Sequence, residues 1–412
     1  MNFLGQIDVE KIELINYKGD FIDISGLVEE LNIYEDIYSP TLSGNAIIVD
    51  ALDLPSTYPM TGEEQIQIEA KSPNSEYKFS FRFYVYKLSG RNVERGRSQS
   101  YVLHFTSRET IVDINKKISK SFKGSGETII QELVTGKTGL NSPKQLFVEP
   151  TGNTFKFISA YWSPIKTINW VTQRSTNKNG AANYLFFETS QSFEYVSAEK
   201  LLSGKAVAEY VFSDVDSRTG SPNEFAKGQG YVKNLSSNVM FDYMRRTAMG
   251  MYSGKLLTFD TNTRVIEGNE YDYLKDFERV KHLDQYPITT DSLLRSKIAT
   301  LYFIEKNDVS SGNPQPYKDW FIQRNSLMEQ LSAYRLAVEV YGRTDIKVGQ
   351  VIDFTINSFK QFTEKEKFEI EDDIYSGKYL ITAIRHRIIG NEHTMFMEII
   401  KDSFATKLQI RA

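Results

Sequence analysis

Alternation of apolar and polar residues with a period of two runs through the first hundred residues. The clearest case is 77–83, in which every second side chain is aromatic, so one face of the strand is buried and the other faces water. Strand patterns at 12–15 and 21–24 flank a polar turn that contains Gly19, which is typical of a hairpin. This region is therefore predicted to form a β-barrel or sandwich of about six strands.

The pattern becomes mixed in the middle of the chain, between about residues 113 and 208. Residues 126–134 have the apolar spacing of a helix. Ser163 is placed as an N-cap with Pro164 at the first helical position, which predicts a second helix over 165–174. These helices alternate with strand-like segments, so we predict an inserted α+β domain.

Strand patterns return after residue 230, and 318–331 is predicted to be a helix with an apolar face. The final hairpin pairs 384–388 with 395–399. We predict an α+β, mostly β fold with two antiparallel barrels or sandwiches. The predicted domains are a first β-barrel at 1–112, an inserted α+β domain at 113–228 and 263–324, and a second β-barrel with the C-terminal hairpin at 229–262 and 325–412.

Composition narrows the chemistry that this chain of 412 residues can carry. Without cysteine it has no disulfide framework, zinc ribbon or thiol nucleophile. Lys and Arg number 49 against 53 Asp and Glu, which argues against a protein that coats nucleic acid. Its apolar runs are far shorter than the roughly 20 residues that span a bilayer, so no membrane insertion is predicted.

Motifs for catalysis and metal binding are missing from the sequence. There is no His-Glu-x-x-His and no Gly-x-Ser-x-Gly. His386 and His393 flank one hairpin turn and can approach each other, but two imidazoles without a third ligand make a poor metal site. We therefore predict no enzyme activity and no catalytic, cofactor-binding or metal-binding residues. Paired carboxylates for glycoside hydrolysis can come from distant segments, and the sequence leaves that alternative open.

Two groups of basic residues stand out. One comprises Arg91, Arg95 and Arg97, in the polar connection of the long hairpin of the first barrel. The other lies between Lys116 and Lys123, where four lysines are spaced to form a helical stripe. The arginines lack interleaved aromatic side chains that would stack on bases, so we predict no sequence-specific nucleic-acid binding. A solvated hairpin tip, or a tip that contacts another protein, explains them better.

The order of several segments resembles the central baseplate hub proteins of contractile-tailed bacteriophages. Residues 38–50 and 59–68 are similar to their first barrel, and 163–170 with 184–195 to their inserted domain. The resemblance ends with the segments 324–331, 340–342, 347–349, 377–382 and 401–403.

This resemblance implies two barrels with the tail-tube fold in a homotrimer, so that three copies present a pseudo-six-fold ring. Such a hub adapts the trimeric cell-puncturing spike to the hexameric tail tube. Other implied partners are further baseplate proteins and the tape measure protein. The implied location is the tail baseplate of the virion, with synthesis and assembly in the host cytoplasm.

On this basis the interface candidates are Arg91, Arg95 and Arg97, with Tyr243, Arg245 and Arg246 in the first half of the second barrel. One alternative is the hub of a related contractile injection or secretion system. A glycan-binding or peptidoglycan-degrading tail protein is a more distant alternative.

Overall fold

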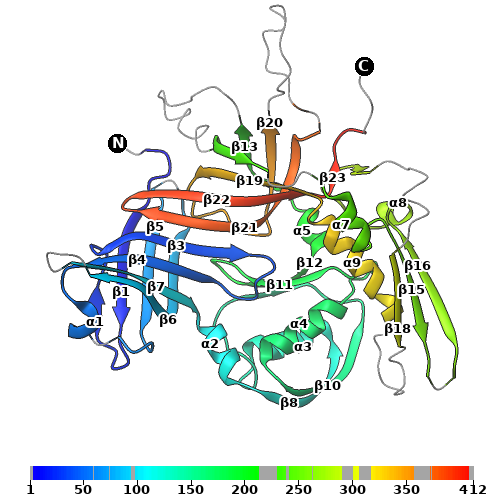
Figure 1. Cartoon of the computed structure of the whole chain (residues 1–412), viewed down its shortest axis with the longest axis horizontal. Helices are drawn as coiled ribbons and strands as arrows, with labels where there is room; N and C mark the ends of the chain where they lie inside the picture. Colours follow the sequence, from blue (N-terminus) through cyan, green and yellow to red (C-terminus); the bar gives the residue numbers. More distant parts are fainter. Residues whose placement is uncertain are drawn as a thin grey trace, which may run out of the picture.

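The computed structural model describes residues 3–58, 60–73, 75–93, 98–212, 230–237, 241–261, 263–289, 300–305, 317–356, 372 and 374–407. Most of its regular structure is β, and the largest unit is a sheet of 13 strands (Figure 1). The predicted fold class, mostly β with two barrels and an inserted α+β unit, is confirmed.

The first barrel has the strand order β3-β4-β7-β6-β5-β1. Its core holds Phe79, Phe81 and Phe83, the aromatic side chains of the alternating segment. The chain just before β1 closes the ring, because the amide of Ile7 donates to the carbonyl of Asn391 at 2.9 Å. Its elements are β1 (Asp8–Ile15), β2 (Phe21–Asp23), β3 (Val28–Asp36), β4 (Ser43–Asp50), α1 (Leu54–Thr57), β5 (Gln65–Lys71), β6 (Lys78–Val93) and β7 (Gln99–Ser107).

The α+β unit that follows packs helices against two small sheets, β10-β8 and β11-β12-β9. The helix at 164–174 begins as predicted, because the hydroxyl of Ser163 accepts from the amide of Lys166 at 3.3 Å. The predicted helical stripe of lysines is wrong: 118–125 is a strand in which Ile118 and Phe122 are buried. The elements are α2 (Arg108–Asn115), β8 (Ile118–Ser125), α3 (Gly126–Thr135), β9 (Leu146–Val148), β10 (Thr154–Trp162), α4 (Pro164–Arg174), β11 (Tyr184–Glu188), β12 (Phe193–Ser197) and α5 (Ala198–Leu202).

The second barrel combines strands from distant parts of the chain in the order β14-β19-β22-β21-β20-β13. A bridge between Val211 and Tyr231 joins β13 back to the segment before β14. Residues 206–212, which the predicted boundaries assign to the insertion, thus pair with this barrel. The strands are β13 (Ala206–Phe212), β14 (Val232–Ser236), β19 (Tyr334–Tyr341), β20 (Val351–Ile356), β21 (Gly377–Ile389) and β22 (Glu392–Lys401).

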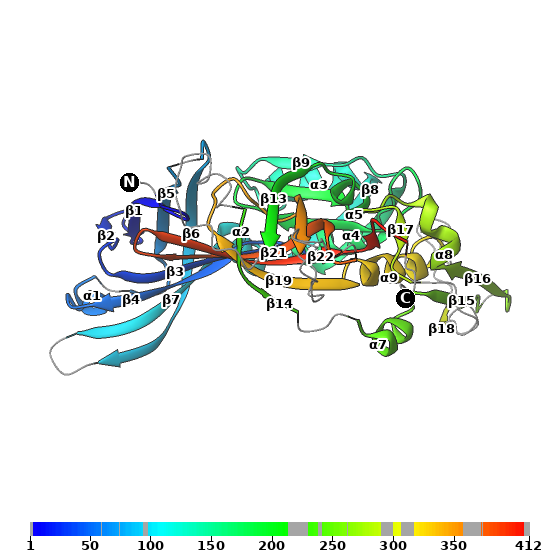
Figure 2. The same cartoon turned by 90° about the horizontal axis from the view of Figure 1, so that it is seen from above.

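The two barrels share the C-terminal hairpin. The first part of β21, 377–380, pairs with β20 of the second barrel, and 383–388 pairs with β3 of the first. Figure 2 shows β21 and β22 running from one barrel into the other. The barrels are therefore joined by continuous hydrogen-bonded strands.

A smaller sheet, β16-β15-β18, lies at the end of the molecule opposite the first barrel and packs on α9 (Figure 1). The predicted boundaries place 253–259 in the second barrel, but in the structure this segment pairs with β16 and β18. The remaining elements are α7 (Tyr243–Ala248), β15 (Ser253–Phe259), β16 (Ile266–Asp272), α8 (Tyr273–Asp276), η1 (Phe277–Arg279), β17 (Tyr286–Pro287), β18 (Thr300–Glu305), η2 (Tyr317–Asp319), α9 (Phe321–Gln330) and β23 (Ser403–Phe404).

Candidate assembly interface

The hairpin of β6 and β7 projects from the first barrel (Figure 2). Arg91 lies within β6 and not in a loop, because the strand pairing continues to Val93. Its Nε donates to Oε1 of Gln99 at 2.8 Å, and its Nη2 lies 3.4 Å from Oδ1 of Asp53. These contacts hold a partly exposed positive charge at a defined place. Arg95 and Arg97 lie outside the described residues.

The second predicted group lies on α7, and its members differ in exposure. The Tyr243 ring packs 5.6 Å from that of Tyr252, and the exposed Arg245 lies 3.4 Å from Glu329. The guanidinium of Arg246 is buried and donates to the carbonyl of Ala333. Arg246 therefore fastens α7 to the connection between α9 and β19 and is not a surface contact, which corrects its place among the interface candidates.

Arg91 and the residues of α7 do not come together in one copy of the chain. The β6/β7 hairpin lies at one end of the molecule in Figure 2, and α7 lies well away from it along the long axis. If both contact partners, they belong to different contacts.

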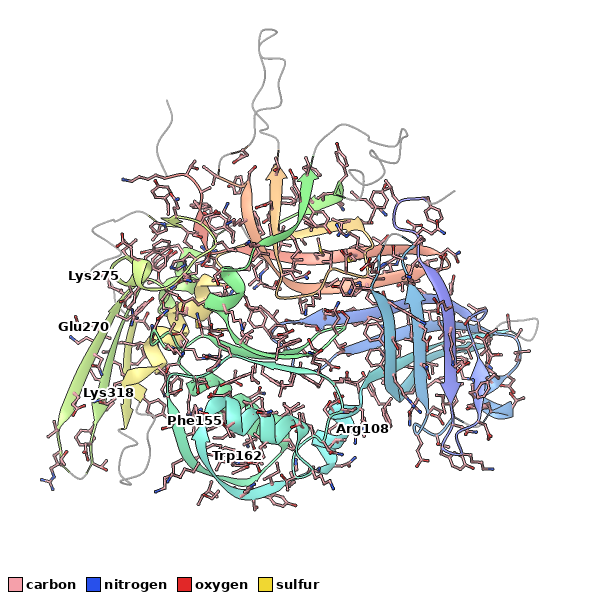
Figure 3. All side chains as sticks on the ribbon, turned by 180° about the vertical axis from the view of Figure 1, so that it is seen from behind. Arg108, Phe155, Trp162, Glu270, Lys275 and Lys318 are labelled. Atoms are coloured by element: carbon pink, nitrogen blue, oxygen red, sulfur yellow. The ribbon has the colours of Figure 1, made fainter. Side chains whose placement is uncertain are left out.

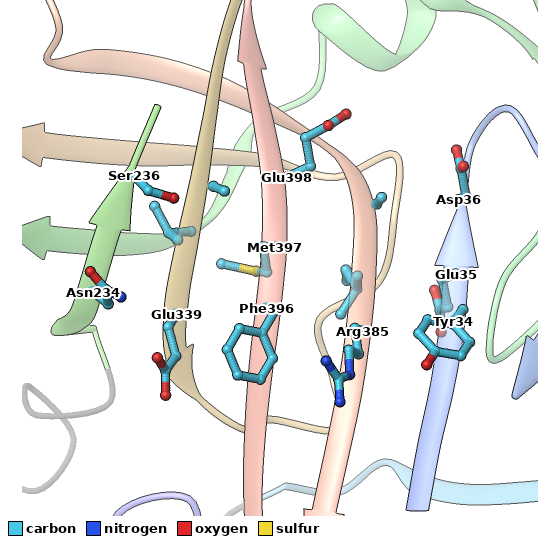
Figure 4. A pocket seen from close by; sticks show the side chains of 14 residues that line it. Tyr34, Glu35, Asp36, Asn234, Ser236, Glu339, Arg385, Phe396, Met397 and Glu398 are labelled. Atoms are coloured by element: carbon cyan, nitrogen blue, oxygen red, sulfur yellow. The ribbon is translucent and has the colours of Figure 1, made fainter. Parts of the chain in front are cut away.

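A groove of about 350 Å³ crosses five strands of the large sheet (Figure 4). Its lining mixes acidic side chains with apolar ones, such as those of Ala337, Ala383 and Phe396. Burial, and then the neighbouring carboxylate of Glu398, raises the pKa of Asp36 above its ordinary value. Sequence reasoning missed this groove because its strands come from both ends of the chain. Its lining residues are Tyr34, Glu35, Asp36, Asn234, Ser236, Ala337, Val338, Glu339, Ala383, Ile384, Arg385, Phe396, Met397 and Glu398.

A ladder of polar contacts flanks the groove. Arg385 donates through Nε to Oδ1 of Asn32 at 2.8 Å and through Nη2 to Oε1 of Glu30 at 3.0 Å. Arg387 donates to the other oxygen of the same carboxylate at 2.9 Å. Burial alone would raise the pKa of Glu30, but Arg387 and Asn32 outweigh it and hold that pKa below its usual value. These hydrogen bonds thus hold the charged side chains on this face in place.

The sheet β16-β15-β18 has apolar side chains on both faces, and its outer face also carries an ion pair of Lys255 with Glu270, which is labelled in Figure 3. Leu256 faces the core, whereas Ile266, Leu301 and Phe303 are each more than half exposed on the outer face. Strand pairing places Leu257 of β15 beside Phe303 on that face. An exposed apolar sheet face of this kind is typical of a protein that works in an assembly.

Several buried charges in the described part of the chain pair with each other. The ammonium of Lys144 lies 2.9 Å from the Glu109 carboxylate and also contacts that of Glu188. His282 bonds through Nδ1 to Asp402 at 2.7 Å and through Nε2 to the carbonyl of Phe277 at 3.0 Å. Among the described residues no group of three or more His, Asp or Glu side chains is arranged to hold a metal ion.

No helix within the described ranges is both long enough and apolar enough to cross a bilayer. No family model matches this sequence, and neither does any curated protein. Two solved structures are similar over nearly their whole length. The 43 kDa tail protein of prophage MuSo2 from Shewanella oneidensis superimposes with a TM-score of 0.57 at 9% identity, covering 95% of this chain and 98% of that one. The tail protein from Neisseria meningitidis MC58 gives a TM-score of 0.55 at 10% identity, covering 95% and 96%.

The chain has the fold of these phage tail proteins. The resemblance to phage tail proteins noted in the sequence is thereby confirmed at the level of the fold. At about 10% identity no side-chain role transfers from either structure.

Proposed function

We propose that this protein is a structural hub of the baseplate of a contractile phage tail. Three copies would form a pseudo-six-fold ring that adapts a trimeric cell-puncturing spike to the hexameric tail tube. The observation that carries the proposal is the continuous pairing of β21 with both β20 and β3, within a fold that matches two phage tail proteins over 95% of the chain.

Rigid coupling of the barrels is what such an adaptor requires. A homotrimer of two-barrel chains presents six barrel units, and they approximate six-fold symmetry only if the two barrels of each copy keep a fixed orientation. A flexible linker would let that orientation vary. Strands that cross from one barrel into the other supply the fixed orientation.

The α+β unit is held on the first barrel by buried polar contacts. Leu42 lies between β3 and β4 of the first barrel, and its amide donates to the carboxylate of Glu188 in β11 at 2.9 Å. The same carboxylate also accepts from Lys144. Glu109 of α2 binds the same ammonium. We propose that the insertion forms the outer or distal body of the hub, in a fixed position relative to the barrels.

Arg91, Arg95, Arg97, Tyr243 and Arg245 remain proposed contacts with partners or with other copies. The exposed apolar face of β16-β15-β18 supports an assembled state. Proposed partners are the spike, the tube protein, other baseplate proteins and the tape measure protein, in the baseplate of the virion. We propose no enzymatic role.

The same fold supports a second candidate function, the hub of a related contractile injection or secretion system. The neighbouring genes, and not the fold, distinguish the two. A peptidoglycan-degrading role predicts clearing of a zymogram by the purified chain, and such clearing would overturn the structural assignment.

The test is the assembly state of the purified chain with its spike partner. Light scattering and electron microscopy are expected to give a homotrimer with the spike on one face. Monomers alone, in the presence of the spike, would remove most of the support for the proposal.

A further inference from the structure

A polar cluster of Glu35, His386 and His393 lies between the apolar cores of the two barrels. All three side chains are buried, and both imidazoles are 0% exposed. On the same strand as His386, Ile388 belongs to the core of the first barrel and Ile384 to that of the second. These three residues, called here the histidine joint, therefore lie where the two barrels meet.

The side chains of the histidine joint follow one another in a line. Nδ1 of His386 lies 3.1 Å from Nε2 of His393, and Nε2 of His386 lies 3.7 Å from Oε1 of Glu35. Glu35 also accepts from the amides of Ser190 at 3.0 Å and Val348 at 3.3 Å. Each oxygen of Glu35 therefore accepts from a backbone amide.

One placement of the hydrogens suits this arrangement when both rings are neutral. The carboxylate of Glu35 calls for a hydrogen on Nε2 of His386, which leaves Nδ1 of that ring as an acceptor. Nε2 of His393 then donates to it, and Nδ1 of His393 carries no hydrogen. The opposite tautomers would turn a lone pair of His386 towards the carboxylate and leave the N–H at Nδ1 of His393 buried without an acceptor, which is costly. In the favoured tautomers the Nε2–H of His386 points towards a carboxylate oxygen 3.7 Å away, which is too far for a hydrogen bond but attractive by charge.

A further proton has no favourable place in the closed joint. It would go to Nδ1 of His393, which has no hydrogen-bond partner among the described residues. The backbone of Gly342 lies against this ring so closely that a Cβ there would be 2.3 Å from Nδ1. Burial, which is the largest cause, and the positive charge of Lys233 hold the pKa of His393 well below its usual value.

We propose that the histidine joint is a pH-sensitive connection between the two barrels, closed when its two imidazoles are neutral and opened by the uptake of a further proton. The charged groups facing it are Glu35 from β3 and Lys233 from β14, and Lys233 lies 3.5 Å from Glu392 at the start of β22.

The direction of the pH effect follows from proton binding. The closed joint resists protonation of His393, whereas an exposed histidine takes up a proton near pH 6.5. Opening is therefore favoured by acid. For one proton, the opening equilibrium constant rises about tenfold for each pH unit below about 6.5, until the closed form itself is protonated.

The tautomers are tested on the full chain with ¹⁵N-labelled histidine, since the chain has only 4 histidines to assign. At pH 7.5 both His386 and His393 are expected to carry hydrogen on Nε2, and His393 to stay neutral well below the pH of about 6.5 at which an exposed histidine titrates. A hydrogen on Nδ1 of His393, or its titration near pH 6.5, would overturn the proposal.

The opening is tested by amide hydrogen exchange of peptides from β21 and β22 between pH 7.5 and 5, corrected for the intrinsic exchange rate. The wild type should lose about tenfold protection per pH unit, whereas His393→Gln, which keeps a donor at the Nε2 position, should lose much less. The matched control is His104→Gln, in the first barrel beside Ser89, which should behave as the wild type. An unchanged slope in His393→Gln refutes the proposal, and if that variant does not fold, the tautomers of the wild type decide.

Discussion

Ile384 and Ile388 lie four residues apart on the inner face of β21, yet they pack in different cores. Ile384 is part of the second-barrel core and Ile388 of the first. Because one strand passes through both cores, a movement of one barrel relative to the other would have to break its pairing or its packing. The two barrels should therefore unfold together.

Truncation of Ile388 tests this coupling. Ile388→Ala should cost about 2–5 kcal/mol, because it leaves a cavity at a buried position. The loss should lower the urea midpoint of both barrels in a single transition, followed by circular dichroism and by hydrogen exchange of peptides from each barrel. The neighbouring Ile389→Ala, at a position that is 41% exposed, should change stability by only about 0.5 kcal/mol. If the two barrels unfolded in separate transitions, and the substitution shifted only the transition of the first barrel, the shared strand would not couple them.

Removal of Lys144 tests the buried charge cluster of the α+β unit, in which Glu188 also accepts from the amide of Leu42 in the first barrel. Lys144→Met leaves the carboxylates of Glu109 and Glu188 buried without a counter-charge, so we expect a loss of about 2–4 kcal/mol at pH 7. Chemical unfolding measures it. The loss should shrink in acid, where carboxylates are neutralised.

A surface pair supplies the control for Lys144. Lys120 and Glu132 form an ion pair in which both side chains are about 40% exposed, so Lys120→Met should cost at most about 1 kcal/mol. If the two substitutions lowered the free energy of unfolding equally, the buried Lys144 cluster would contribute no more than an exposed ion pair.

Acid should weaken the pair of Asp345 with Arg343, in the loop where Thr344 donates to the carbonyl of Tyr77 in the first barrel. Burial alone would raise the pKa of Asp345, but Arg343 outweighs it and holds that pKa below its ordinary value. The stabilisation is thus present above about pH 4 and lost as pH falls through the lowered pKa.

Asp345→Asn should therefore be less stable than the wild type by about 1 kcal/mol at pH 7, with the difference vanishing near pH 2. Thermal melts across this pH range measure it. Glu63→Gln, at an exposed position, serves as the control and should match the wild type throughout. A difference that persists at pH 2 would mean that the ion pair is not its source.

Charge reversals separate the proposed contacts from the buried arginine. Arg91→Glu and Arg245→Glu should leave the melting temperature almost unchanged, because exposed ion pairs contribute little, but should impair assembly in sedimentation velocity. Arg246→Glu should unfold or strongly destabilise the chain, because it places an unpaired carboxylate against the carbonyl of Ala333. Normal assembly of both exposed variants would refute their assignment.

Local patterns in the sequence predicted local structure well. The alternating aromatic residues of β6 point into the first core, and Ser163 caps α4 as its place before Pro164 indicates. Both features depend on neighbours within a few residues. The helix predicted around Lys120 was wrong. The lysines are spaced three or four residues apart, which fits a helix, but the segment is a strand that buries Ile118 and Phe122.

Local sequence patterns do not indicate which distant strands pair with each other. Nothing near Ile388 indicates that its strand pairs with β3, which lies more than 350 residues away. Arg245 and Arg246 are adjacent in sequence, and only the helix orientation decides which one is buried. The approach of His386 to His393 across the hairpin was expected from the sequence, but the groove and the position of Glu35 in the histidine joint depend on long-range pairing and were not.

The proposed hub arrangement can be seen by electron microscopy of the particle that this chain forms with its spike, averaged down its symmetry axis. This arrangement requires a homotrimer whose spike face has three-fold symmetry and whose opposite face shows six barrels in a nearly six-fold ring. A monomer, or a ring whose copies place their two barrels at variable angles, would contradict it.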